Sequence, residues 1–162
     1  MRPNPLLYIE TSVFGFCFDR RPHNAARREA ALALFRQIEA GLFRAVTSPV
    51  TARELARSTE PLRSQVLELL DGVEELTLDV EEVERLAQAY IRDGVLPGDF
   101  ADDARHAAYA AIAGVDVIVS MNLQHLANEW AERRLSAVNL REGYRLISIR
   151  TPEETLHYEG QD

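Results

Sequence analysis

Short apolar runs alternate along the chain with longer segments in which apolar residues recur at helical spacing. The runs at residues 6–9, 45–47, 73–78, 115–119 and 144–149 are predicted to be strands. Helical spacing predicts helices over residues 24–41, 61–70, 79–94, 99–114 and 123–135, and a further helix that starts at residue 49. No repeat, linker or low-complexity segment interrupts the alternation. The pattern therefore predicts an α/β fold with a largely parallel sheet, in one domain over residues 1–162.

Capping residues sharpen several of these boundaries. Ser48 followed by Pro49 is typical of a helix start, with proline at the first helical position. Asp79 and Glu82 have the spacing of a capping box. Gly114 is expected to end the helix that precedes the strand at residues 115–119.

Two segments have no clear periodicity. Phe14, Phe16 and Phe18 surround Gly15 and predict an apolar loop packed on the core, with a platform for stacked bases as the alternative. The polar C-terminal tail, residues 151–162, is expected to cover an edge of the sheet.

Several polar side chains that could form a ligand site lie within residues 98–125. Asp99 is expected to cap a helix that carries Asp102 and Asp103 in its first turn, and Asn122 follows the buried strand at residues 115–119. Ligands of open parallel sheets bind at the carboxyl ends of the strands, so Asp103 and Asn122 can meet there. The alternative is that acids in a first helical turn only complement the helix dipole.

Charge and composition exclude several classes of protein. The formal net charge of −8 argues against non-specific electrostatic binding of nucleic acid over a large surface. All 18 basic side chains are arginines, whose planar forks suit phosphate or carboxylate recognition. The absence of lysine argues against a P-loop and against the receiver and haloacid-dehalogenase types of aspartate chemistry, which all use one.

The chain of 162 residues, 46% of them hydrophobic, is long enough to bury a core without disulfides. Its single cysteine, Cys17, has no partner for a disulfide or a zinc cluster, which indicates a reducing compartment. The N-terminus, MRPNPLLYIE, lacks the apolar core of a signal peptide, and no later run is long enough to cross a bilayer. We therefore expect a cytoplasmic protein without a membrane partner.

Three dispersed carboxylates need a common explanation. Glu10 ends the first strand, Glu54 lies in the helix after the second, and Asp103 heads the helix before the strand at residues 115–119. An α/β fold can bring such acids to one sheet edge, where a hard cation such as Mg²⁺ or Mn²⁺ takes oxygen ligands. Asp103 is preferred to Asp102 because its side of the helix continues through alanines, which are small enough to face a sheet.

The strings YIETS, SPVTARELAR and DDARHAAYAAIAGVDVIVSMN together resemble the PIN-domain family of metal-dependent ribonucleases, which includes the toxin half of many bacterial toxin–antitoxin pairs. The resemblance runs from about residue 6 to residue 152. It implies a three-layer α/β/α sandwich.

Matched position by position, the family's first acid falls on Glu10 and its hydroxyl position on Ser12. The helical glutamate falls on Glu54, the third acid on Asp103 and the fourth acid on Asn122. The family usually has aspartate at the first and fourth positions. Glu10 keeps the charge, whereas Asn122 offers only a neutral carbonyl oxygen and should weaken magnesium binding.

The resemblance implies that Glu10, Glu54 and Asp103 hold Mg²⁺ or Mn²⁺ for the hydrolysis of RNA. Arg105, His106 and His125 are candidate contacts with phosphate or base, and Ser12 is a further candidate for binding the substrate. A cognate antitoxin is an implied partner, and a homodimer stays open.

Two other functions also remain open. One is a non-catalytic PIN-like module that binds a protein or nucleic acid, which Asn122 favours. The other is a metal-dependent phosphoesterase that acts on a substrate smaller than RNA.

Overall fold

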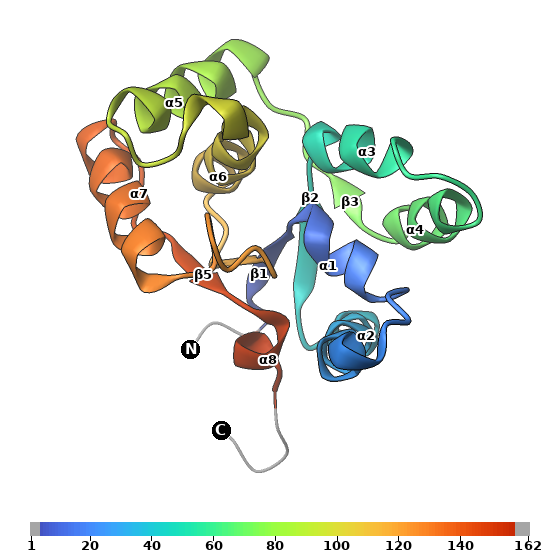
Figure 1. The fold of residues 1–162 in the computed structure, drawn as a ribbon. Coiled ribbons are helices and arrows are strands. Elements are labelled where there is room, and N and C mark those ends of the chain that lie inside the picture. Colours follow the sequence, from blue (N-terminus) through green and yellow to red (C-terminus); the bar gives the residue numbers. More distant parts are fainter. Residues whose placement is uncertain (1–3, 158–162) are drawn as a thin grey trace.

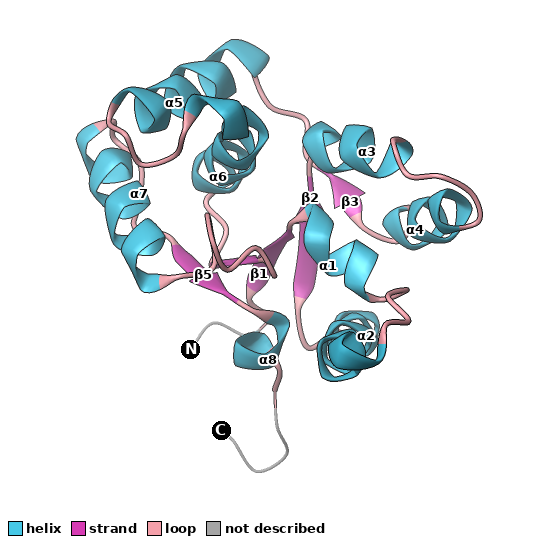
Figure 2. Ribbon diagram, in the orientation of Figure 1, coloured by secondary structure: helices cyan, strands magenta, loops and turns pink. Residues whose placement is uncertain are grey.

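A computed structural model describes residues 4–157, and Figures 1 and 2 show how their helices and strands are arranged. The strands are β1 (Leu6–Ile9), β2 (Arg44–Thr47), β3 (Glu74–Glu75), β4 (Val117–Val119) and β5 (Ser148–Arg150). The helices are α1 (Thr11–Phe16), α2 (Ala25–Glu39), α3 (Pro49–Ala56), α4 (Leu62–Leu70), α5 (Val80–Arg92), α6 (Ala101–Ala113), α7 (Glu129–Arg141) and α8 (Pro152–Thr155). Two short 3₁₀ helices, η1 (Pro22–Asn24) and η2 (Gly98–Phe100), precede α2 and α6.

Within residues 4–157, five strands form one parallel sheet in the order β3-β2-β1-β4-β5. The central strand, β1, pairs with β2 on one side and with β4 on the other. Because all five strands run in the same direction, their carboxyl ends share one edge. Glu10, Ser48 and Ser120 directly follow β1, β2 and β4 at this edge.

Helices cover both faces of the sheet (Figure 1). Successive side chains of a strand point to opposite faces, so Tyr8 packs in one core while Leu7 and Ile9 pack in the other. The core around Tyr8 is built largely from α5, α6 and α7, and the core around Leu7 largely from α1, α2 and α4. The predicted three-layer α/β/α sandwich with a parallel sheet is confirmed.

The segment around Gly15 differs from the prediction. An apolar loop is expected there, but Thr11–Phe16 forms helix α1. Glu10 caps this helix, because its side chain accepts a hydrogen bond from the backbone N–H of Ser12. A helix of six residues is too short for its periodicity to stand out in the sequence. Val13 and Phe14 are nevertheless buried, as a core-packed segment requires.

The structure corrects several predicted boundaries of helices and strands. The helix predicted from residue 123 begins only at Glu129, because the Oδ1 of Asn128 accepts a hydrogen bond from the backbone N–H of Ala131 at 2.8 Å. Asp99 does not cap α6, whose N-cap is Phe100 without a side-chain bond. The strands predicted at residues 73–78 and 144–149 shrink to the two residues of β3 and the three of β5.

Other capping predictions are confirmed in part. Ser48 caps α3 through the backbone N–H of Val50, and Gly114 ends α6 in the left-handed conformation with φ 67°. Asp79 caps α5, but Glu82 accepts a hydrogen bond from the hydroxyl of Tyr144 at 2.6 Å and completes no capping box.

The described part of the C-terminal tail packs beside α2. Its short helix α8 follows the edge strand β5, and the backbone of His157 exchanges two hydrogen bonds with the side chain of Gln37, at 2.7 and 2.8 Å. Residues 158–162 of the tail lie outside the described residues. Among residues 4–157 there is no helix with the length and apolar character that a membrane span requires.

Candidate active site

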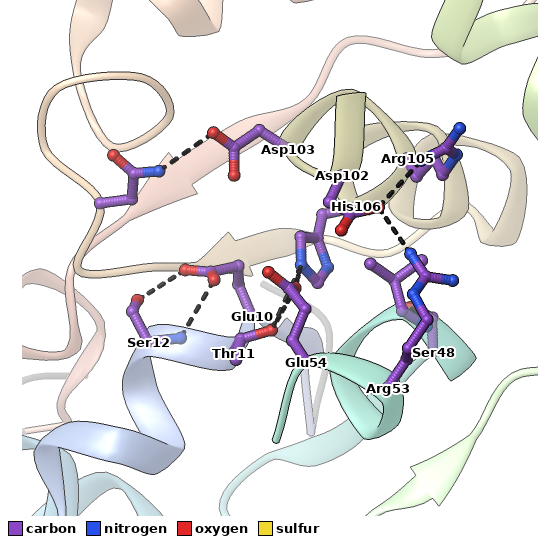
Figure 3. A network of polar contacts seen from close by, with 12 residues as sticks. Glu10, Thr11, Ser12, Ser48, Arg53, Glu54, Asp102, Asp103, Arg105 and His106 are labelled. Atoms are coloured by element: carbon purple, nitrogen blue, oxygen red, sulfur yellow. Dashed lines mark hydrogen bonds and ion pairs between the residues drawn. The ribbon is translucent and has the colours of Figure 1, made fainter. Parts of the chain in front are cut away.

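Glu10 is fixed at the carboxyl edge of the sheet by three donors. Its carboxylate accepts from the backbone N–H of Ser12 at 3.0 Å and from the Ser12 hydroxyl at 2.5 Å (Figure 3). It also accepts from the Ser120 hydroxyl at 2.6 Å. The backbone N–H of Glu10 also donates to the carbonyl of Val119 at the end of β4. Glu10 is only 5% exposed. The first predicted acid is therefore a buried and rigidly held carboxylate.

Asp103 faces the same region from the first turn of α6 (Figure 3). Burial raises its pKa, and the negative charges of Glu10 and Glu54 raise it further, whereas His106 and His125 lower it. The net pKa of Asp103 is about 6. Like charges have thus been gathered where water solvates them poorly, which a bound cation would relieve.

Asp102 is occupied elsewhere although it adjoins Asp103 in the sequence. Its Oδ1 accepts from Arg53 at 2.6 Å and from Arg105 at 2.9 Å. Burial disfavours the charged form of this carboxylate, but the two arginines outweigh burial and lower its pKa. The structure therefore brings Asp103, and not Asp102, toward Glu10. That Asp103 is a metal ligand stays a prediction.

Glu54 is bound to a buried histidine that the sequence does not identify as its partner. Its Oε1 lies 2.5 Å from Nε2 of His106 and accepts from the Thr11 hydroxyl at 2.7 Å (Figure 3). Burial disfavours the charged form of both groups, yet their mutual hydrogen bond and charges outweigh it. The pKa of Glu54 is lowered and the pKa of His106 is raised.

His106 also anchors this pair to the core. Its Nδ1 lies 2.7 Å from the hydroxyl of Tyr8, which lies 2.6 Å from the hydroxyl of Ser48. His106 and Tyr8 are both fully buried. The expectation that His106 contacts phosphate or base is therefore wrong. Helical spacing places His106 near Asp103. The partners of His106, however, come from the distant elements β1 and α3, so no pattern near His106 in the sequence identifies them.

Asn122, at the position of the family's fourth acid, lies next to Asp103 and donates a hydrogen bond to it. Its Nδ2 donates to Oδ2 of Asp103 at 3.3 Å, and its Oδ1 accepts from the backbone N–H of His125 at 3.1 Å. The amide oxygen, which the sequence suggests as a neutral metal ligand, is thus engaged with the backbone. In this arrangement Asn122 orients Asp103.

The residues predicted to bind substrate differ in how far they are already engaged. The Ser12 hydroxyl donates to Glu10 and accepts from the backbone N–H of Met121 at 2.9 Å, so it supports the carboxylate. Arg105 donates twice to Glu84, at 2.9 and 3.1 Å, in addition to its bond to Asp102. A contact between Arg105 and substrate stays a prediction and would have to compete with these ion pairs.

His125 is partly exposed and lies against Phe100, with ring centroids 4.1 Å apart. Its charge acts on Asp103. It therefore lies beside the carboxylates with part of its surface open to solvent, and its contact with substrate also stays a prediction.

An acid-lined cleft of about 270 Å³ opens beside these groups. Its walls include Glu54, Asp99, Asp102, Asp103 and Arg105. Within residues 4–157 no three His, Cys, Asp or Glu side chains are clustered closely enough to hold a metal ion, and the bonds of Glu54 to His106 and Thr11 engage the third carboxylate. The donor chemistry still fits a hard cation, because Glu10 and Asp103 both offer carboxylate oxygens and the charge of Glu10 acts on Asp103.

The all-parallel five-stranded sheet between two helical layers is a PIN-like fold. A solved structure with the same fold is that of VapBC-1 from nontypeable Haemophilus influenzae. The alignment covers 91% of this chain and 98% of the matched chain, with a TM-score of 0.56 and 15% sequence identity. Neither a family model nor a curated protein sequence matches the chain.

Proposed function

We propose that this protein is a divalent-metal-dependent ribonuclease whose site lies between Glu10 and Asp103. The observation that carries the proposal is the placement of buried Glu10 and half-buried Asp103 at the carboxyl edge of a parallel sheet, where burial, and then the charge of Glu10, raises the pKa of Asp103 to about 6. Open parallel sheets bind their ligands at this edge. The PIN-like fold and the resemblance in YIETS and DDARH support RNA as the substrate.

In this proposal Glu10 and Asp103 hold Mg²⁺ or Mn²⁺. When bound, such an ion lowers the pKa of water and offsets charge that develops on a phosphate. Hydrogen bonds within the chain hold the two carboxylates in position: Ser12 and Ser120 donate to Glu10, and Asn122 donates to Asp103. Glu54 adds negative charge at the cleft, and its hydrogen bond with His106 provides a site where a proton can be held.

We extend the proposal to a toxin that is held by an antitoxin, as the resemblance to the PIN-domain family implies. An apolar groove of about 760 Å³ runs between the end of α1, α2 and α4, lined by Phe18, Phe35, Ile38, Leu69 and Val73. Its lining also includes the acidic side chains of Glu39 and Glu68. Such a groove suits a partner segment with apolar anchors and basic flanks. It equally favours the alternative function, a binding module without turnover.

Adjacent aspartates give a matched test of the nuclease proposal. Single-turnover cleavage of a single-stranded RNA should depend on added Mg²⁺ or Mn²⁺, and Asp103→Asn should abolish it. Asp102→Asn changes charge equally on the same helical turn and should retain cleavage, because Asp102 pairs with Arg53 and Arg105. Equal cleavage by the two variants would refute the assigned site, and no cleavage by the wild type at any metal concentration would favour the binding module.

A further inference from the structure

A second groove adjoins the candidate active site on the side of α1. It has a volume of about 460 Å³, and its lining includes Ser12, Gly15, Phe16, Phe18, Arg20 and Arg21. Ser12 also binds the carboxylate of Glu10 (Figure 3), so the groove begins where the candidate site ends. An aromatic floor and a basic rim thus lead away from the carboxylates.

The rim of this groove reverses the charge of the chain as a whole. The charged side chains that line this groove are Arg20, Arg21 and Asp19, a net charge of +1 in a chain of net charge −8. Arg21 is bound by Asp19, yet its side chain is still 67% exposed. Arg20 is exposed and has no hydrogen-bond or ion-pair partner among the described residues. At least one guanidinium is therefore available to a phosphate at the groove.

Gly15 keeps the floor of the groove open. Glycine inside a helix costs about 0.5–1 kcal/mol relative to alanine, so its presence in α1 needs a reason. Its φ is not positive, and a Cβ built on it would meet no atom within 4 Å. Neither backbone conformation nor packing requires glycine at this position. The open space lies beside Phe16, whose ring already has the guanidinium of Arg27 5.9 Å from its centroid.

We propose that this groove binds the stretch of single-stranded RNA that flanks the scissile phosphate. The inference rests on the proposed ribonuclease function. Bases would pack against Phe16 over the gap at Gly15, and phosphates would pair with Arg20 and Arg21. Stacking on aromatic side chains next to basic side chains is the general way in which proteins hold single strands without reading their sequence. The exposed arginines of the groove can attract a polyanion although the chain as a whole is acidic.

The test measures binding apart from cleavage. Fluorescence anisotropy of a labelled single-stranded RNA is followed with the full chain in EDTA, over a range of salt concentrations. Gly15→Leu should fold, because leucine favours helix and its Cβ meets no atom, but its side chain fills the groove. We expect it to weaken binding about fivefold or more, the equivalent of one lost stacked base. Gly15→Ala is the matched control, because its single methyl group fills less of the groove, so it should weaken binding less than Gly15→Leu does.

The basic rim has its own matched pair. Arg20→Ala should lower the slope of log affinity against log salt by about 0.7, the value for one lost phosphate contact on a single strand. Arg92→Ala removes the same charge at the end of α5, away from α1 in Figure 1, and should leave the slope unchanged.

Unchanged binding by both Gly15→Leu and Arg20→Ala would overturn the inference, as would the absence of RNA binding by the wild type. The outcome of the cleavage test on Asp103→Asn does not depend on the outcome of these binding measurements. Groove-dependent RNA binding without any metal-dependent cleavage would keep this groove and reject the nuclease.

Discussion

Replacing Asp103 by asparagine removes one negative charge from the region of Glu10 and Glu54 while keeping the size of the side chain. The pKa of Asp103 rises from its ordinary 3.8 to about 6 in the folded protein, first because of burial and then because of Glu10. At about 1.4 kcal/mol per pKa unit, this shift lowers the free energy of unfolding at pH 7 by about 3 kcal/mol. Partial solvent exposure reduces the expected effect to about 2 kcal/mol.

The sign of the effect follows from proton binding. A carboxyl whose pKa is raised on folding binds protons more readily in the folded state, so the metal-free protein loses stability as the pH rises from 3.8 through about 6. Asp103→Asn should therefore raise the Tm of the metal-free protein at pH 7, by roughly 4–8 °C for about 2 kcal/mol in a domain of this size. The advantage of the variant should fade as the pH falls toward 4.

Thermal unfolding in EDTA and in Mg²⁺ provides the assay. Mg²⁺ should stabilise the wild type, by about 2.7 kcal/mol at a hundred times its dissociation constant, and should stabilise Asp103→Asn much less. Asp102→Asn is the control. It breaks ion pairs with Arg53 and Arg105, so it should lower metal-free stability by about 0–1 kcal/mol. A destabilised Asp103→Asn protein at pH 7 in EDTA would refute the electrostatic reasoning.

Two further variants probe the neighbours of the carboxylates. Asn122→Asp replaces a donor to Asp103 by a second carboxylate, so metal-free stability should fall by about 1–2 kcal/mol while calorimetry detects tighter Mg²⁺ binding; no change in either quantity would remove Asn122 from the site. His106→Gln leaves Glu54 without its charged partner and should lower stability by about 1–3 kcal/mol. The stabilisation by this ion pair is present above the ordinary pKa of Glu54, 4.5, and is lost as the pH rises above 6.5 through the raised pKa of His106. Chemical denaturation should therefore find that His106→Gln costs less stability at alkaline pH. A cost that does not change with pH would argue against an ion pair.

Local patterns in the sequence predict most of the fold. The strand runs and helical spacings lie close to most of the observed elements. Burial on both sheet faces makes the inner strands β1 and β4 apolar, whereas the edge strand β3 consists of two exposed glutamates. Helix α1 and the late start of α7 escape prediction because one capping side chain decides each of them. These errors lie beside the candidate site, where the chain leaves β1 and β4.

The candidate site is predictable only in its outline. Four matched positions single out Glu10, Glu54, Asp103 and Asn122. In the structure Glu10 follows β1 and Asn122 donates to Asp103, whereas Glu54 is bound to His106. In the sequence, the small residues on its side of the helix favour Asp103 over Asp102, but α6 is buried nearly all around. What separates Asp103 from Asp102 is that arginines bind Asp102. Such partners come from distant elements and leave no local signal.

The central claim is that a divalent cation at Glu10 and Asp103 enables the protein to cleave RNA. One titration tests it directly: Mn²⁺ is added to the metal-free full chain, and bound Mn²⁺ and single-turnover RNA cleavage are measured in the same samples. The account predicts that both saturate at the same Mn²⁺ concentration and that Glu10→Gln loses both. Cleavage that persists in EDTA, or Mn²⁺ binding that Glu10→Gln leaves unchanged, would contradict it.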